Sequence, residues 1–162
     1  MAENLNYKPK GDTASYCYGD DSTNCKLYGR LYTWDAAKDL CPDGWYLPSR
    51  SDYETLFGKV GGQSAVGTKL NTAEGWIDNG KGTNDIGFST LPGGERLADG
   101  SYIGKGVSAF FRTITEAGEN DAILMAIGLL EQYDGAYLAH HGDSTGKSLA
   151  LSVRCIKKSD TP

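Results

Sequence analysis

Apolar residues in the first third of the chain recur at helical spacing in two stretches. Over residues 31–40 an apolar side chain stands at every third position, which predicts one helix. A second helix is predicted to begin after Ser49 or Ser51, because serine is a favoured N-cap, and to end at Gly61.

The pattern changes after residue 62. Isolated apolar residues stand among Gly, Asn, Asp and Thr over residues 63–108, which indicates a long irregular loop region. Short strands are predicted at residues 2–6, 108–114, 122–130, 136–140 and 149–157. The predicted fold class is α+β: two helices, the loop region and an antiparallel sheet of short strands. We expect one domain over residues 1–162, since this length suits a single core.

The run from Ala122 to Leu130 contains only apolar residues and one glycine. A strand with one face in water alternates apolar and polar residues, and this run does not. It is either a central strand buried on both faces or a strand with an exposed apolar face for a partner. Burial on both faces is the interpretation we favour.

Composition and charge exclude several classes of partner. The net charge of −5 leaves no basic stripe for nucleic acid or for an anionic membrane surface. No apolar run approaches the roughly 18 residues that span a bilayer. The first residues are polar and do not resemble a signal peptide. We expect this sequence to be one domain of a longer protein whose export signal lies elsewhere.

The chain contains four cysteines, an even number, and their spacing is compatible with two disulfides. Cys17 and Cys25 are close in sequence, whereas Cys41 and Cys155 enclose most of the chain. A bond within each pair would combine a local staple with a bridge that closes the domain, and it would imply an oxidising compartment. Four reduced thiols or a zinc site are also compatible with the count, and the zinc site is disfavoured because the chain has no C-x2-C pair.

Several collinear motifs resemble the Fibrobacter succinogenes major paralogous domain family. They are Met1-Ala-Glu-Asn-Leu-Asn-Tyr7, Tyr28-Gly-Arg-Leu-Tyr-Thr-Trp34, Cys41-Pro-Asp-Gly-Trp-Tyr-Leu-Pro-Ser49, Gly67-Thr-Lys-Leu70, Gly87-Phe-Ser-Thr-Leu-Pro-Gly-Gly94 and Ser152-Val-Arg-Cys155. The resemblance implies a C-type-lectin-like fold, in the version shared with formylglycine-generating enzymes. It also implies a secreted or lipid-anchored protein at the surface of a bacterium. Trp34, Trp45 and Trp76 belong to the framework of such a domain and are expected in its core.

One segment departs from the family pattern. Phe111-Arg-Thr-Ile-Thr-Glu116 stands where the family typically has Phe-Trp-Ser-Ser-Thr-Glu. A retained scaffold with altered content over residues 112–148 resembles the variable proteins of diversity-generating retroelements. We therefore predict a ligand-binding surface in this segment. Its predicted contact residues are Arg112, Ile114, Glu119, Asn120, Met125, Gln132, Tyr133, Tyr137, His140, His141 and Asp143.

These residue types suit direct contact with a partner. Tyrosine supplies rigid area, arginine and histidine supply charge-assisted hydrogen bonds, and isoleucine and methionine supply apolar burial. We expect a monomeric, non-catalytic domain that binds a protein at the cell surface, with a glycan as the second possible target. Two different functions stay open beside this one: a self-associating adhesin module, and an enzyme related to formylglycine-generating enzymes.

Catalytic and metal sites have little support in the sequence. His140 and His141 are the only histidines, and neighbours on a strand point to opposite faces. A formylglycine-generating enzyme needs a reactive cysteine, which a disulfide would remove. No cofactor is expected. The oxygen-rich pairs Asp78-Asn79 and Asn84-Asp85 are compatible with a structural Ca2+, although turn-forming residues are the favoured explanation.

Overall fold

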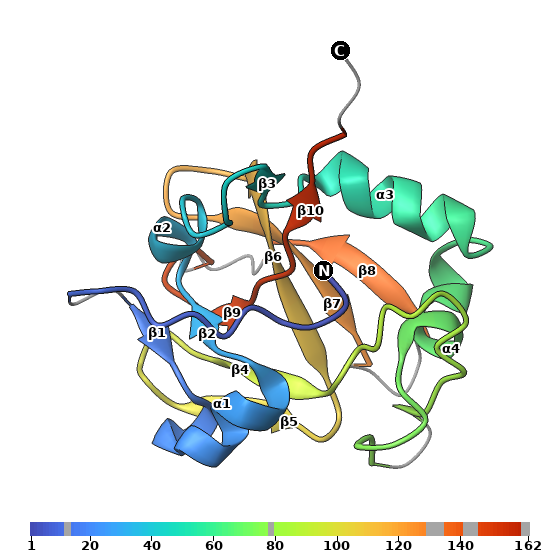
Figure 1. Cartoon of the computed structure of the whole chain (residues 1–162), viewed down its shortest axis with the longest axis horizontal. Helices are drawn as coiled ribbons and strands as arrows, with labels where there is room; N and C mark the ends of the chain where they lie inside the picture. Colours follow the sequence, from blue (N-terminus) through green and yellow to red (C-terminus); the bar gives the residue numbers. More distant parts are fainter. Residues whose placement is uncertain (12–13, 78–79, 129–134, 141–145, 160–162) are drawn as a thin grey trace.

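The computed structural model describes residues 1–11, 14–77, 80–128, 135–140 and 146–159. These residues form a curled eight-stranded sheet, a small two-stranded sheet and short helices (Figure 1). The α-helices are α1 (Ser22–Tyr28), α2 (Trp34–Ala37), α3 (Arg50–Lys59) and α4 (Val66–Leu70). Two 3-10 turns are η1 (Tyr18–Asp20) and η2 (Gln63–Ala65). The architecture is thus mixed α and β, with sheet predominating.

The main sheet runs in the order β1-β2-β9-β6-β4-β5, and β7 pairs with both β6 and β8. Its strands are β1 (Ser15–Tyr16), β2 (Leu31–Tyr32), β4 (Gly93–Arg96), β5 (Tyr102–Lys105), β6 (Ala109–Glu116), β7 (Ala122–Ile127), β8 (Ala136–Ala139) and β9 (Leu151–Ser152). The small sheet pairs β3 (Trp45–Tyr46) with β10 (Ile156–Lys157). Because β6 pairs in parallel with β4 and with β9, the main sheet is mixed, and the predicted antiparallel sheet is wrong in this respect.

The second predicted helix is α3, and its start is fixed by a capping box. Ser49 Oγ accepts a hydrogen bond from the Asp52 N–H at 3.2 Å, and the Asp52 carboxylate accepts one from the Ser49 N–H at 2.8 Å. Each side chain thus satisfies a backbone donor that the first helical turn leaves without a partner. The prediction from Ser49 is confirmed.

The first predicted helix is largely wrong. Leu31 and Tyr32 form β2, which pairs with β1 on one side and β9 on the other, and helix α2 covers only Trp34–Ala37. Leu31 and Tyr32 are 2% and 0% exposed, so their apolar character reflects burial in a central strand. A two-residue strand followed by one helical turn reproduces helical spacing by coincidence.

Residues 63–108 contain more regular structure than predicted: η2, α4, β4 and β5 lie in this region. The glycines that suggested a loop permit close packing instead. Gly94, in β4, has a φ of +65°, and a Cβ there would lie 2.3 Å from the Ile103 carbonyl oxygen. Only glycine fits that approach of the two backbones.

The ends of the chain also differ from prediction. Residues 2–6 form no strand, although the Leu5 N–H donates to the Val153 carbonyl at 2.9 Å. The predicted last strand is divided into β9 and β10 by residues 153–155. These two short strands belong to different sheets, which explains the break.

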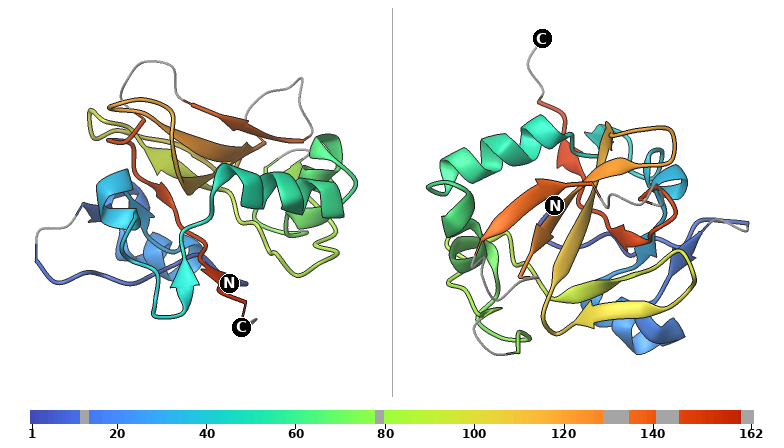
Figure 2. Two further views of the ribbon diagram at one scale, coloured as in Figure 1. Left: turned by 90° about the horizontal axis from the view of Figure 1, so that it is seen from above. Right: turned by 180° about the vertical axis from the view of Figure 1, so that it is seen from behind.

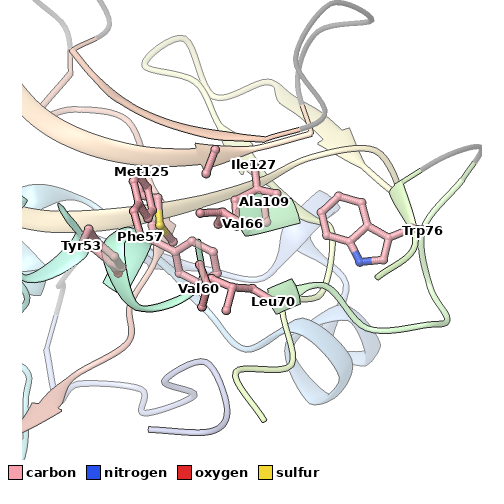
Figure 3. Close-up of a cluster of buried hydrophobic side chains, with 11 residues drawn as sticks. Tyr53, Phe57, Val60, Val66, Leu70, Trp76, Ala109, Met125 and Ile127 are labelled. Carbon is pink, nitrogen blue, oxygen red and sulfur yellow. The ribbon is translucent and has the colours of Figure 1, made fainter. Parts of the chain in front are cut away.

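Strand β7 is buried on both faces, as the unbroken apolar run predicted. Met125 and Ile127 pack in a cluster with side chains of α3 and α4 (Figure 3). Leu124 and Ala126 belong to a second cluster on the opposite face. Helices α3 and α4 therefore cover one side of this part of the sheet (Figure 2). No helix among the described residues has the length and apolar character needed to cross a membrane.

Candidate functional site

Among the described residues of the predicted binding segment, those of the turn between β6 and β7 form an exposed run. It lies beside α2 in Figure 1, at one end of the main sheet. Ile114 is 38% exposed near the end of β6, and Glu116, the last residue of β6, is exposed together with residues 117–120 of the turn. His140, just after β8, is exposed as well. We call Ile114, residues 116–120 and His140 the turn surface.

The backbone of the turn is tightly bonded. The N–H groups of Ala117 and Gly118 both donate to the Asp121 carbonyl, at 3.0 and 3.2 Å. The Asn120 carbonyl accepts from the Lys147 N–H at 3.0 Å, and the Glu119 carbonyl accepts from Lys147 Nζ at 2.8 Å. These contacts use main-chain atoms of the turn. Its conformation therefore depends little on the side chains at 119 and 120.

Lys147 joins the turn to α2. Its Nζ lies 2.5 Å from the Glu116 carboxylate and 4.6 Å from the centre of the Trp34 ring. The Trp34 indole N–H in turn donates to the Thr113 carbonyl at 3.1 Å, so the ring is fixed under the ammonium group. The Lys147 side chain is 16% exposed, so its cation–π contact is partly desolvated and stronger than in water, whereas Glu116 is 58% exposed and its ion pair is screened by solvent.

Asp121 supports the other end of the turn. Its side chain is 11% exposed, accepts from the Ala122 N–H at 2.8 Å and lies 3.0 Å from His140 Nδ1. Its Oδ1 also occupies the space that a Cβ at position 146 would need, so a larger residue there would displace the Asp121 carboxylate. Asp121 thus holds β7, His140 and the segment at residue 146 together.

Arg112 is not a contact residue, contrary to the prediction. It is 0% exposed and donates to the carbonyl groups of Tyr32 at 3.3 Å, of Gly146 at 2.7 Å and of Leu149. Burial lowers the pKa of Arg112 to about 9, and the Glu95 and Asp121 carboxylates oppose that shift. The guanidinium remains charged at neutral pH and fixes the backbone of residues 146–149.

Met125 is the second correction. It is 0% exposed and lies in the cluster that α3 covers, because inward-facing positions of β7 alternate with positions that face the opposite core. It cannot touch a partner.

The remaining predicted residues are distributed as follows. Ile114, Glu119, Asn120 and His140 are all exposed, and His140 lies 3.0 Å from Asp121 at the end of the turn. Tyr137 is partly buried against the second core cluster, and its pKa is raised by burial and by the Glu95 carboxylate. Outside the described residues lie Gln132, Tyr133, His141 and Asp143. The sequence analysis missed the supporting roles of Trp34, Lys147 and Asp121, since nothing local in the sequence links them.

Both predicted disulfides are present. Cys17 is bonded to Cys25 and Cys41 to Cys155, so no cysteine of the chain is a free thiol. The interpretations as reduced thiols and as a zinc site are therefore wrong. Bonds of this kind are typical of proteins in oxidising compartments.

The described part of the chain holds no cluster of three or more His, Cys, Asp or Glu that suits a metal. Asn84, at a φ of +52°, accepts from the Ser89 N–H at 2.7 Å, and Asp85 pairs with Lys69 at 3.6 Å. Both side chains thus have structural roles in a turn. Asp78 and Asn79 lie outside the described residues.

Comparison with known proteins gives one result. Residues 1–157 match the family described as the Fibrobacter succinogenes major domain. No curated protein and no solved structure matches the chain. The family match agrees with the resemblance seen in the motifs.

Proposed function

The chain belongs to the Fibrobacter succinogenes major domain family, and we propose that it is a non-catalytic domain that binds a protein ligand through the turn surface. The domain would belong to a secreted or surface protein of a bacterium and act as a monomer. We further propose that its fold is C-type-lectin-like. Of the residues predicted from sequence, Ile114, Glu119, Asn120 and His140 carry this proposal.

The main observation behind this proposal is that the groups that hold the turn in place are not the side chains that it exposes. The turn is held by its own backbone and by buried groups beneath it, whereas the side chains of Glu119 and Asn120 make no hydrogen bond to any described residue. A rigid backbone lowers the entropy cost of binding, and unoccupied polar side chains are available to a partner. This arrangement also allows those side chains to vary without loss of the fold, as the resemblance to variable proteins implies.

A protein ligand suits the turn surface better than a glycan. The exposed groups are carboxylates, an amide, an imidazole and an isoleucine, and the described turn contains no aromatic ring. A polar, exposed turn of this kind suits the solvent-accessible rim of a protein–protein interface.

The two competing functions, enzyme and self-associating module, lose their main support. A formylglycine-generating enzyme requires a free cysteine, and all four are in disulfides. Self-association was expected through residues 122–130, but the described part of that run, β7, is buried between β6 and β8. The disulfides support the extracellular or surface location that we propose.

The test uses a displayed library of random peptides and a glycan array, both probed with the oxidised domain. Peptides that bind the wild-type domain are measured again with Glu119→Lys and with Glu74→Lys, an equal charge change at an exposed position away from the turn. We expect the first variant to weaken binding at least about tenfold and the second to leave it unchanged. Binders that respond equally to both variants, or binding to glycans that depends on Glu119, would contradict the proposal.

A further inference from the structure

A shallow groove lies next to the turn surface, between the segment that follows α2 and strand β3. Its volume is about 320 Å3, and its lining includes Lys38, Asp39, Cys41, Trp45, Leu47 and Ile114. Ile114 belongs to both the groove and the turn surface. The groove itself is formed by different elements, so it is a separate candidate site.

Trp45 differs from the other two tryptophans. Trp34 and Trp76 are 8% and 4% exposed and lie in the interior, as expected, whereas Trp45 is only partly buried and lines the groove. Trp45 packs against the core cluster that contains Leu47 and Val153, so the expectation of three core tryptophans holds only in part for Trp45, which keeps some exposed surface. A partly exposed indole presents an apolar face that a ligand can cover.

The groove is built on a rigid base. Cys41 is bonded to Cys155, Leu47 is 3% exposed, and Trp45 pairs with Lys157 between the two short strands. The backbone N–H of Trp45 also donates to the Pro42 carbonyl at 2.9 Å. Little ordering is required when a ligand enters such a site, which favours binding.

The polar groups at the rim define what the ligand must offer. Lys38 is held 2.9 Å from Asp35, but Asp39 is exposed and its carboxylate makes no hydrogen bond to the described residues. An ionised carboxylate only accepts hydrogen bonds, so the ligand must supply donors. It must also bear an apolar face for the indole and carry no negative charge near Asp39.

We propose that this groove binds a neutral pyranose unit of a glycan. One face of the ring, formed by C–H groups, covers Trp45, while ring hydroxyl groups donate to Asp39. The volume is at the lower end of the range of small-molecule sites, which suits one sugar ring rather than a long chain. Nucleotides and acidic sugars meet these requirements less well, because an anionic group would lie close to the Asp39 carboxylate and because Lys38, the cation of the rim, is already paired with Asp35. This site does not rest on the protein-binding role of the turn surface.

The experiment titrates methyl glucoside, methyl galactoside, methyl mannoside and methyl xyloside into the oxidised domain. Tryptophan fluorescence reports binding, because Trp45 is the most exposed of the three indoles. At least one glycoside is expected to change the emission saturably and to protect it from quenching by acrylamide. The matched pair of variants is Asp39→Asn at the groove and Asp43→Asn at an exposed turn outside its lining.

Asp39→Asn is expected to weaken binding of that glycoside at least about tenfold, since a charged acceptor is lost. Asp43→Asn and Glu119→Lys are expected to leave it unchanged. Trp45→Phe should remove the fluorescence response. Far-ultraviolet circular dichroism of this variant shows whether it is folded. If Trp45→Phe does not fold, the result for Asp39→Asn still tests the proposal. Absence of saturable binding by all four glycosides, or binding that is insensitive to Asp39→Asn, would overturn the proposal. Because Glu119→Lys separates the two sites, failure here leaves the proposal for the turn surface intact.

Discussion

The stem and the turn of the β6–β7 hairpin lie next to each other in sequence but obey different constraints. In the stem, residues 109–113 and 122–127 are all buried, and even the charged Arg112 has no exposed surface. In the turn, residues 117–120 are all exposed and are held through backbone atoms. A single hairpin thus combines positions that fix the structure with positions that are free to contact a partner.

This contrast separates stability from binding. Changes in the stem remove buried contacts and should lower the free energy of unfolding, whatever they do to binding. Changes in the turn should alter binding at nearly constant stability. Substitutions in the stem and in the turn test whether the boundary between them lies where the exposed fractions of the residues change.

The largest effect is expected for Arg112→Met. Three buried carbonyl groups, those of Tyr32, Gly146 and Leu149, would lose their donor. The free energy of unfolding should fall by about 3–5 kcal/mol, as measured by denaturant titration. Arg50→Met is the control, because Arg50 is exposed and its ion pair with Glu54 is worth less than about 0.5 kcal/mol. Equal losses for the two variants would show that Arg112 does not support the stem.

A second test compares the two disulfides. The Cys41–Cys155 bond closes 114 residues and ties α2 to the last strands, whereas Cys17–Cys25 closes only 8. Replacing both cysteines of the long bridge by alanine should lower the free energy of unfolding by about 3–4 kcal/mol, and the same change in the short bridge by about 2 kcal/mol. Thermal and denaturant unfolding of the two double variants measures the difference. A greater loss from the short bridge would contradict the entropic explanation.

Sequence reasoning succeeded where the determinants are local or are set by composition. The capping box of α3 needs only Ser49 and Asp52, three residues apart. An apolar residue at every position of β7 indicates burial on both faces without knowledge of its neighbours. The cysteine spacing was sufficient to pair all four residues correctly.

Sequence reasoning failed where distant segments decide the outcome. Arg112 and Ile114 stand two residues apart and would share a face of a regular strand, yet the β6–β7 register shifts after Arg112. Arg112 is then buried by carbonyl groups from Tyr32 and from residues 146–149, which no local pattern reveals. Strands β4 and β5 were missed for a similar reason, since Gly94 of β4 is required by close backbone contact with β5.

Asp121 lies at the boundary between stem and turn and should give an intermediate effect. Asp121→Ala removes the acceptor for the Ala122 N–H and the partner of His140. We expect a loss of about 1–2 kcal/mol in the free energy of unfolding and faster hydrogen exchange of the amides of the turn. Asp35→Ala is the control, because Asp35 is exposed and only pairs with Lys38. Unchanged exchange in Asp121→Ala would show that the turn is held without it.

A smaller effect on stability is expected at the N-terminus of α3. This end of the helix contacts β6, where the backbone N–H of Arg50 donates to Thr115 Oγ1 at 2.9 Å. Partial burial opposes ionisation of Asp52, but its hydrogen bonds with Ser49 outweigh burial and lower the pKa of Asp52. The folded-state pKa thus lies below the unfolded value of about 3.9. The stabilisation is present above that value and is lost as the pH falls through the folded-state pKa.

Asp52→Asn should therefore cost about 1 kcal/mol at pH 7 and make the unfolding free energy less dependent on pH below about 4. Denaturant titrations at pH 7 and pH 3 measure both effects, with Asp43→Asn as the control at an exposed turn. A variant that keeps the wild-type pH dependence would show that the capping box does not depend on the charge of Asp52.

The smallest effect on stability is expected within the turn. The backbone carbonyls of Glu119 and Asn120 accept hydrogen bonds from Lys147, and their side chains are not needed for these contacts. Glu119→Gln and Asn120→Ala should therefore change the free energy of unfolding by less than about 0.5 kcal/mol. Lys147→Met, which removes the ammonium but keeps the length of the side chain, should cost more than either, because it breaks contacts to Glu116, to the Glu119 carbonyl and to the Trp34 ring. If the two turn variants destabilise the protein as much as Lys147→Met, the side chains of the turn are structural, and the separation between stem and turn does not hold.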